Sequence, residues 1–141
     1  MEILLATGAR LRKARPGRTG PALVFSHGAG AGTDHPWYAE FLAVLRDFHG
    51  AIWWLDFPAR AAGRRAPDRS PVMVDSATLA AARVAQESGG SVILGGRSMG
   101  GRVAAGTFHE SIRGGLAVGY PLTPLGHPEK TAGRAELLRG V

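Results

Sequence analysis

The sequence predicts an α/β domain in three α/β/α layers with a mostly parallel sheet, on three observations. Short apolar runs of strand type alternate with segments of helical periodicity along the chain. The apolar run 91–95 leads directly into Gly96-x-Ser98-x-Gly100, and a small-residue helical pattern follows it. The length of 141 residues suits a single domain with its own core, which we take to span 1–141.

The expected elements follow in order along the chain. Strands are expected over 1–6, 22–26, 51–57, 91–95 and 115–120, and helices from Pro36 and over 72–88, 99–109 and 132–139. Two regions that contain glycine, proline and arginine, 8–20 and 58–71, are expected to be loops. Gly89-Gly90 is expected to end the 72–88 helix, because glycine tolerates the left-handed backbone of a helix end.

Two of the expected helices carry one apolar face each. The faces consist of Trp37, Phe41, Leu45 and Phe48 in the first helix, and of Met73, Ala77, Ala80 and Val84 in the second. We expect both faces to pack on the sheet. The run 51–57 is very apolar, which is typical of a central strand that is covered on both sides.

Composition and charge exclude several classes of function. The chain has no cysteine, which excludes disulfides, thiolate metal sites and a cysteine nucleophile. The histidines lack a metal-ligand spacing, so no metal and no organic cofactor is predicted. No apolar run is long enough for a membrane span and no signal peptide is evident, so a soluble, cytoplasmic protein is expected. The net charge of +6 permits a nucleic-acid surface, but a coding bias towards arginine explains it more simply, and no nucleic-acid partner is predicted.

Ser98 is the strongest candidate for a catalytic residue. Small residues two positions before and after it, Gly96 and Gly100, are what a nucleophile elbow requires at its strained strand-to-helix turn. The amide of Met99 would then face the oxyanion that forms during acyl transfer. The alternative is a glycine-rich turn in which Ser98 only caps the following helix.

A glycine-rich loop, His27-Gly28-Ala29-Gly30-Ala31-Gly32, lies between an expected strand and an expected helix. Lipases and esterases have an HGGG-type loop in this place, with backbone N–H groups that face the oxyanion. A dinucleotide-binding loop requires a third glycine where this chain has Thr33, so we do not expect one. His27 is expected to be structural rather than a catalytic base.

Five segments carry a resemblance to a known family. They are HGAGAGTDHPW at 27–37, LDFP at 55–58, GRRAPDR at 63–69, GGRSMGGRVA at 95–104 and GYPLTPLGHPEK at 119–130. The chain resembles the α/β-hydrolase fold, and more narrowly the bacterial proteins related to the KANL3/Tex30 group. The segments have the same order as in that group and span nearly the whole chain.

The resemblance implies a serine hydrolase that acts on an ester or related acyl bond of a small molecule. It implies an oxyanion hole formed by backbone amides, and a loop brace is the favoured interpretation of Asp34-His35-Pro36. The arginines at 60, 64, 65 and 69 either border the pocket or form a solvated loop, and the solvated loop is favoured. The implied site residues are Ser98, Met99 and Ala29 for catalysis and Gly28, His35 and Arg97 for substrate binding.

The acid and the base that should follow Ser98 are not evident. α/β-hydrolases use the order Ser, Asp or Glu, then His, but no aspartate follows Ser98. His109 is expected to point away, and His127 and Glu129 lie on a proline-bracketed loop that rarely orients such neighbours. We therefore expect a C-terminally incomplete fold whose open sheet edge self-associates. A catalytically idle, hydrolase-like binding module is the alternative function.

Overall fold

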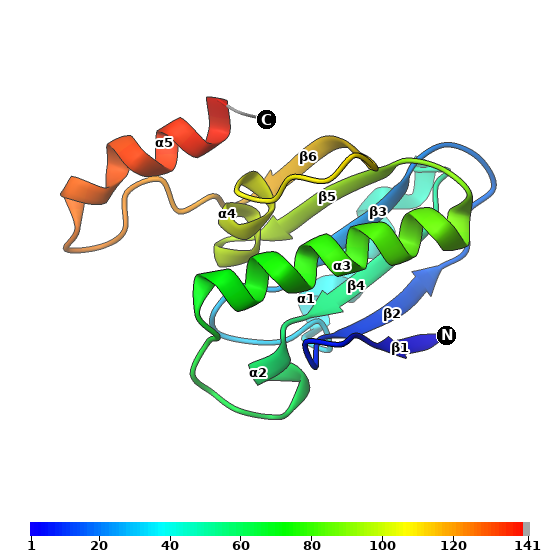
Figure 1. Ribbon diagram of the computed structural model, residues 1–141, viewed down its shortest axis with the longest axis horizontal. Helices are drawn as coiled ribbons and strands as arrows, with labels where there is room; N and C mark the ends of the chain where they lie inside the picture. The colour runs from blue at the N-terminus through cyan, green and yellow to red at the C-terminus, as the bar shows by residue number, and fades with distance from the viewer. Residues whose placement is uncertain (140–141) are drawn as a thin grey trace.

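The computed structural model describes residues 1–139, which form one six-stranded sheet in the order β1-β2-β4-β3-β5-β6 (Figure 1). The four parallel strands are β4 (Ile52–Asp56), β3 (Ala22–Ser26), β5 (Val92–Arg97) and β6 (Ile112–Val118). At one edge, β1 (Glu2–Leu4) and β2 (Arg10–Arg15) continue the sheet with antiparallel pairing. The predicted α/β class with a mostly parallel sheet is confirmed.

Helices cover both faces of the sheet. They are α1 (Pro36–Val44), α2 (Pro58–Ala61), α3 (Ser70–Ser88), α4 (Met99–Ala105) and α5 (Thr131–Arg139), with 3-10 turns at Leu45–Asp47 and Pro128–Lys130. α3 and α4 pack on one face, α1 packs on the other, and α5 projects beyond the end of the sheet (Figure 1). Within residues 1–139, every helix is too short or too polar to cross a bilayer.

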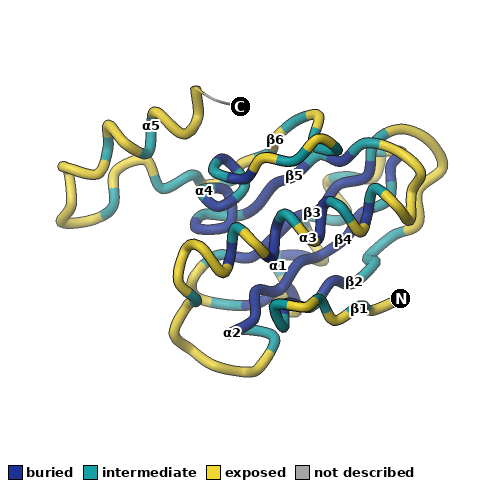
Figure 2. Tube along the Cα trace, in the orientation of Figure 1, coloured by how far each residue is buried: buried dark blue, intermediate teal, exposed yellow. Residues whose placement is uncertain are grey.

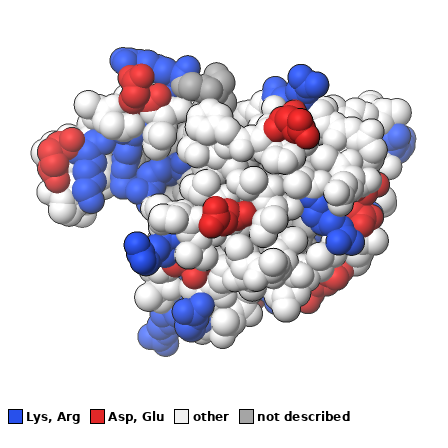
Figure 3. Space-filling view, in the orientation of Figure 1, with Lys and Arg blue, Asp and Glu red and all other residues white. Residues whose placement is uncertain are grey.

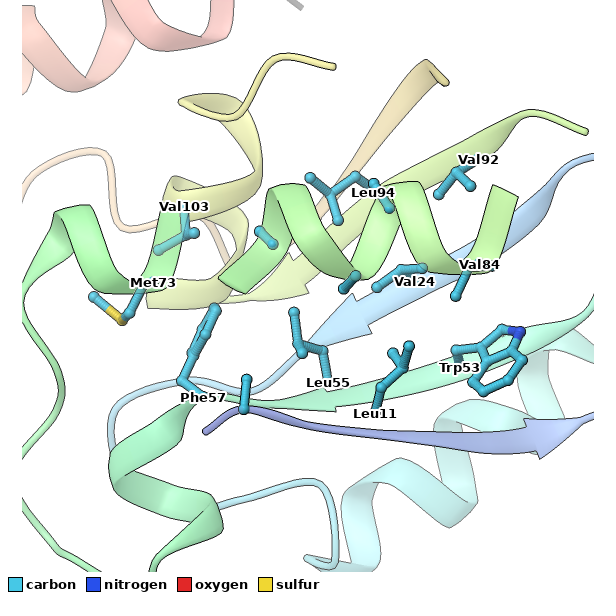
Figure 4. Close-up of a cluster of buried hydrophobic side chains, with 14 of the residues drawn as sticks. Leu11, Val24, Trp53, Leu55, Phe57, Met73, Val84, Val92, Leu94 and Val103 are labelled. Carbon is cyan, nitrogen blue, oxygen red and sulfur yellow. The ribbon is translucent and has the colours of Figure 1, made fainter. Parts of the chain in front are cut away.

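The larger core lies between α3 and the sheet (Figure 4). Trp53 and Leu55 of β4 face this layer, and Phe57 follows them at the end of the strand. The residues expected on one face of the helix are all buried: Met73, Ala77, Ala80 and Val84. The helix ends where Gly89 adopts a left-handed φ of 66°, as predicted.

An aromatic cluster fills the opposite face of the sheet, around Phe25 of β3. The centroid of its ring lies 4.8 Å from that of Phe41 and 6.2 Å from those of Trp37 and Trp54. Tyr38 is buried in the same cluster, with its ring 5.6 Å from that of Trp54. All four residues predicted for the apolar face pack against this cluster, but only Trp37 and Phe41 belong to α1, because the helix ends at Val44 and Leu45 and Phe48 lie in and after the 3-10 turn that follows.

The region 8–20 contains β2, where we predicted a loop. A turn at Gly8, which has a φ of 89°, reverses the chain between β1 and β2. Leu11 of this strand is fully buried in the larger core. Arg10, Arg12 and Arg15 each donate hydrogen bonds to oxygens of neighbouring segments. The prediction was wrong because acceptors in distant segments of the chain bind these charges, so a basic segment can pair as a strand.

Other boundaries also differ from the sequence prediction. The expected loop 58–71 begins with the short helix α2. α4 ends at Ala105 rather than at 109, since Gly106 caps it, and β6 begins at Ile112 rather than at 115. The expected helix at 132–139 is present as α5, and Gly140 and Val141 lie outside the described residues.

Charge is distributed unevenly over the face shown in Figure 3. Basic side chains gather around α5, whereas acidic and basic side chains are interspersed over the rest of this face. Burial, and then the nearby charge of Arg134, lowers the pKa of Arg102. The net charge of +6 therefore does not form a continuous basic stripe over this face.

Candidate functional site

Ser98 lies at a strained turn between β5 and α4. Its φ of 52° and ψ of −113° are unfavourable for a residue with a side chain, and within residues 1–139 it is the only non-glycine residue with a positive φ. A Cβ at Gly96 would overlap the backbone of Gly100, and a Cβ at Gly100 would overlap Ser26. Both glycines are thus required where α4 approaches the strands, as the motif predicts.

The glycine-rich loop after β3 lies directly beside Ser98. A Cβ built on Gly28 would be 3.3 Å from the carbonyl oxygen of Arg97 and 3.4 Å from the Cβ of Ser98. A pocket of about 520 Å³ opens at this point, and we name it the Ser98 pocket. It is lined by Gly28, Ala29, Gly30, Ala31, His35, Tyr38, Arg97 and Ser98. The structure thus brings the predicted substrate contacts together with the predicted nucleophile.

Two backbone N–H groups near Ser98 have unused hydrogen-bonding capacity. Met99 is the first residue of α4, where N–H groups have no partner in their own helix. Within residues 1–139, neither its N–H nor that of Ala29 donates a hydrogen bond. Ala29 lines the Ser98 pocket, whereas the Met99 side chain is buried in the larger core.

His27 is held by hydrogen bonds on both ring nitrogens. The Phe57 N–H donates to its Nε2 at 3.0 Å, so Nδ1 carries the proton and donates to the Gly28 carbonyl at 2.6 Å. Burial lowers the pKa of His27, although the Gly28 hydrogen bond opposes this effect. The ring is therefore neutral and fully engaged, which makes it a brace for the loop rather than a base.

Asp56 anchors the far end of the glycine-rich loop, a role that the sequence analysis missed. Its carboxylate accepts hydrogen bonds from the Thr33 N–H at 2.8 Å and from Arg10 at 2.6 Å. Burial would raise the pKa of Asp56, but the hydrogen bonds from Arg10 and Thr33 outweigh it and lower the pKa. The available signal was an aspartate at the end of the very apolar β4 strand.

The arginine-rich segment after β4 divides into bound and exposed side chains. Arg60 donates to the Ala29 carbonyl at 3.2 Å and so supports the glycine-rich loop. Arg64 lies 3.9 Å from Asp68, whose carboxylate also accepts the Ala59 N–H at 2.8 Å. The arginines at 65 and 69 are exposed, as a solvated loop predicts. Arg60 is the exception, because it contacts the loop that borders the Ser98 pocket.

Arg97 and His35 are the two basic groups that line the Ser98 pocket. The guanidinium of Arg97 stacks 4.5 Å above the Trp37 ring. His35 caps α1, and its Nδ1 accepts the Trp37 N–H at 3.2 Å. In the neutral His35 ring this hydrogen bond leaves the proton on Nε2, which makes that nitrogen a donor.

The remaining histidines of the C-terminal half lie away from the Ser98 pocket. His109 Nδ1 is 2.7 Å from the Ser111 hydroxyl, beyond the other end of α4. His127 Nδ1 is 3.0 Å from a carboxylate oxygen of Glu129, so these two side chains pair with each other on their loop. Both partners are exposed, and neither lines the Ser98 pocket.

Comparison with known proteins places this geometry in a family. A family model described as an alpha/beta hydrolase domain matches residues 19–140. A search of curated proteins gives no match. An alpha-beta serine hydrolase homologue from Coxiella burnetii has a TM-score of 0.72 at 13% identity, covering 95% of this chain. A thermostable carboxyl esterase from Bacillus coagulans has a TM-score of 0.59 at 15% identity over 83% of the chain. A Pyrobaculum calidifontis esterase has a TM-score of 0.51 at 28% identity over 74% of the chain.

The similarity concerns the fold and a part of each relative. The chain spans 66%, 42% and 36% of the lengths of these three structures. The first two identities are low enough that the likeness shows the fold alone. The family model, by contrast, covers most of the chain and includes both the glycine-rich loop and Ser98. The chain therefore belongs to the alpha/beta hydrolase domain family.

Proposed function

We propose that the chain is a serine hydrolase that cleaves an ester or related acyl bond, with Ser98 as the nucleophile. The observation that carries the proposal is the strained backbone of Ser98 beside a pocket. The capping alternative lacks its hydrogen bond, because the Ser98 side chain accepts no N–H from α4. The esterases among the similar structures support the acyl substrate class.

In the proposed reaction, the Ser98 Oγ bonds to the carbonyl carbon of the substrate and loses its proton. The negative charge that develops on the carbonyl oxygen accepts hydrogen bonds from the Met99 and Ala29 amides. The bond to the leaving group then breaks, and the leaving group takes up a proton. Water hydrolyses the acyl-serine and restores the hydroxyl. Gly28, His35 and Arg97 bind the rest of the substrate.

We assign no base to the Ser98 proton. The hydroxyl forms no hydrogen bond with any group in residues 1–139, and His27 and His35 present protonated or occupied nitrogens. This observation favours the alternative function, a catalytically idle hydrolase-like module that binds a small molecule or a protein partner. The two functions differ in whether Ser98 reacts.

Reaction of Ser98 with a fluorophosphonate probe, followed by intact mass, tests the proposal. We expect one adduct on the wild-type chain and none on Ser98→Ala. Ser91→Ala is the matched control, because Ser91 precedes the same strand at its opposite end, and it should label like the wild type. Folded wild-type protein without an adduct would overturn the hydrolase proposal and favour the idle module.

Three further expectations from the sequence remain predictions. They are the closer relationship to the KANL3/Tex30 group, the cytoplasmic location and the single domain over 1–141. Self-association through the β6 edge is also a proposal, which rests on the unpaired outer side of this strand.

A further inference from the structure

Tyr38 is a buried residue whose hydroxyl has no assigned role. Only 2% of the residue is exposed, and its ring packs against Trp37 and Trp54. The residue nonetheless lines the Ser98 pocket, as do Gly28 and Arg97. The hydroxyl is therefore the part of Tyr38 that reaches the pocket. Within residues 1–139 this O–H donates to no acceptor.

The Tyr38 phenol is a hydrogen-bond donor at neutral pH. Burial raises its pKa to about 12, while Arg97 and a hydrogen bond from the Gly28 backbone act in the opposite direction. The proton therefore stays on the oxygen throughout the neutral range. The O–H is thus available to an acceptor that enters the pocket.

Arg97 supplies a fixed positive charge beside this donor. Stacking on Trp37 holds the guanidinium plane, and within the described residues Arg97 has no ion-pair partner and donates no hydrogen bond. The lining of the pocket contains no aspartate or glutamate, and its other titratable group besides Tyr38 is His35. A planar guanidinium with free N–H groups matches the paired oxygens of a carboxylate or a phosphate.

We propose that the Tyr38 hydroxyl and the Arg97 guanidinium form a subsite for an anionic oxygen group, a carboxylate or a phosphate, on the substrate of Ser98. The inference rests on the proposed function and deepens it, because it names the substrate class. The Ser98 pocket has a volume of about 520 Å³, which is in the range of small-molecule sites. One ligand that carries both the ester and the anionic group therefore fits in it.

Calorimetric titration with benzoate, phenyl phosphate and the neutral benzyl alcohol tests the subsite without any reaction at Ser98. We expect the anions to bind the wild type, and at least about tenfold more weakly to Tyr38→Phe and to Arg97→Gln. Benzyl alcohol should bind weakly and equally to all of them. The difference between benzoate and phenyl phosphate identifies which anion the subsite prefers. Arg97→Lys keeps the positive charge but lacks the paired N–H groups of the guanidinium. Its affinity for the anions should lie between those of the wild type and Arg97→Gln.

Matched controls come from the same residue types elsewhere in the chain. Tyr120→Phe removes a hydroxyl that donates to the Arg134 carbonyl, and Arg46→Gln removes an exposed charge. Both should bind the anions like the wild type. Absence of anion binding, or equal binding to wild type and to both site variants, would overturn the subsite.

The two proposals fail in different ways. If Ser98 takes up the fluorophosphonate but no anion binds, the subsite is wrong and the hydrolase proposal stands. If the anions bind as expected but Ser98 stays unlabelled, the hydrolase proposal is wrong and the pocket is an anion-binding site. If Tyr38→Phe slows labelling by the neutral probe without weakening anion binding, Tyr38 acts on the oxyanion and the subsite is overturned.

Discussion

Gly100 lies where the backbone of α4 comes closest to the sheet. A methyl group there would overlap Ser26 and the His27 carbonyl, so Gly100→Ala is expected to lower the free energy of unfolding by about 1–3 kcal/mol. It should also abolish labelling of Ser98, because the turn can no longer close. Urea unfolding and intact mass measure the two effects.

Gly90→Ala is the matched control for this substitution. A Cβ at Gly90 meets nothing within 4 Å, so the variant should unfold like the wild type and keep the Ser98 adduct. Equal stabilities of Gly100→Ala and Gly90→Ala would contradict the packing argument for the elbow.

His27 makes the stability of the fold depend on pH. Its pKa is lowered by burial from the usual 6.5, so the unfolded chain takes up a proton that the folded ring resists. The contribution of the neutral His27 ring to the free energy of unfolding is fully present above pH 6.5, and it is lost as the pH falls through the pKa of the folded state. The free energy of unfolding should therefore decrease on acidification below about pH 6.5, by at most about 1.4 kcal/mol per pH unit.

Two variants isolate this effect in urea titrations at several pH values. His27→Asn should be less stable than the wild type and show a shallower dependence on pH. The exposed His49→Asn should keep the wild-type dependence. A wild-type stability that is constant between about pH 8 and pH 5.5 would rule out His27 as a buried neutral brace.

The site residues that could be predicted from the sequence are those that belong to short motifs with a characteristic spacing. Ser98 and Gly28 belong to short motifs between an apolar run and a helical pattern, and the structure brings them together. Asp56 and Tyr38 were missed for a physical reason. Asp56 pairs with Arg10 across 46 positions of the chain, and Tyr38 and Arg97 come to line the same pocket only after α1 packs on the sheet. Such long-range contacts have no signature in one sequence.

Asp56 connects three elements, and its removal tests that connection. The carboxylate at the end of β4 joins β2 through Arg10 and the glycine-rich loop through Thr33. Asp56→Asn is expected to lower the free energy of unfolding at neutral pH by about 1–3 kcal/mol, because it leaves Arg10 without its charge partner. It should also displace the loop and slow Ser98 labelling.

The same substitution should change the response to acid. The pKa of Asp56 lies below its usual 3.8, because hydrogen bonds to Arg10 and Thr33 outweigh burial, so its stabilisation is lost as the pH falls below that value. Asp56→Asn should therefore show a smaller loss of stability in acid than the wild type. The exposed Asp47→Asn serves as control and should change stability by less than about 0.5 kcal/mol.

Helices and strands with a clear apolar pattern were predictable from the sequence. Those in which composition and apolar pattern favour different structures were not. The α3 face follows from apolar periodicity and the β3 strand from a short apolar run, and the structure confirms both. β2 was hidden because basic composition and nearby glycine and proline favour a loop. Its strand conformation depends on acceptors in other elements, such as the Leu45 carbonyl for Arg15.

On the scale of the whole molecule, alternation of strands and helices was sufficient to predict the α/β class. Within residues 1–139, β6 has β5 on one side only, and its residues are partly or fully exposed, in contrast to the buried central strands (Figure 2). A hollow of about 500 Å³ lies beside it, lined by Phe108, Ile112 and residues of α4.

An unpaired strand edge next to an apolar hollow is a template for pairing with a second copy. We expect the wild-type chain to self-associate and Gly114→Lys to be a monomer, as measured by light scattering over a range of concentrations. A Cβ at Gly114 meets only Ile93, at 4.0 Å, so the lysine fits the folded chain and places its charge at the edge. Gly133→Lys, in α5 with open space around it, adds the same charge away from the edge and should associate like the wild type. A monodisperse wild-type monomer would show that the β6 edge is not an interface between copies.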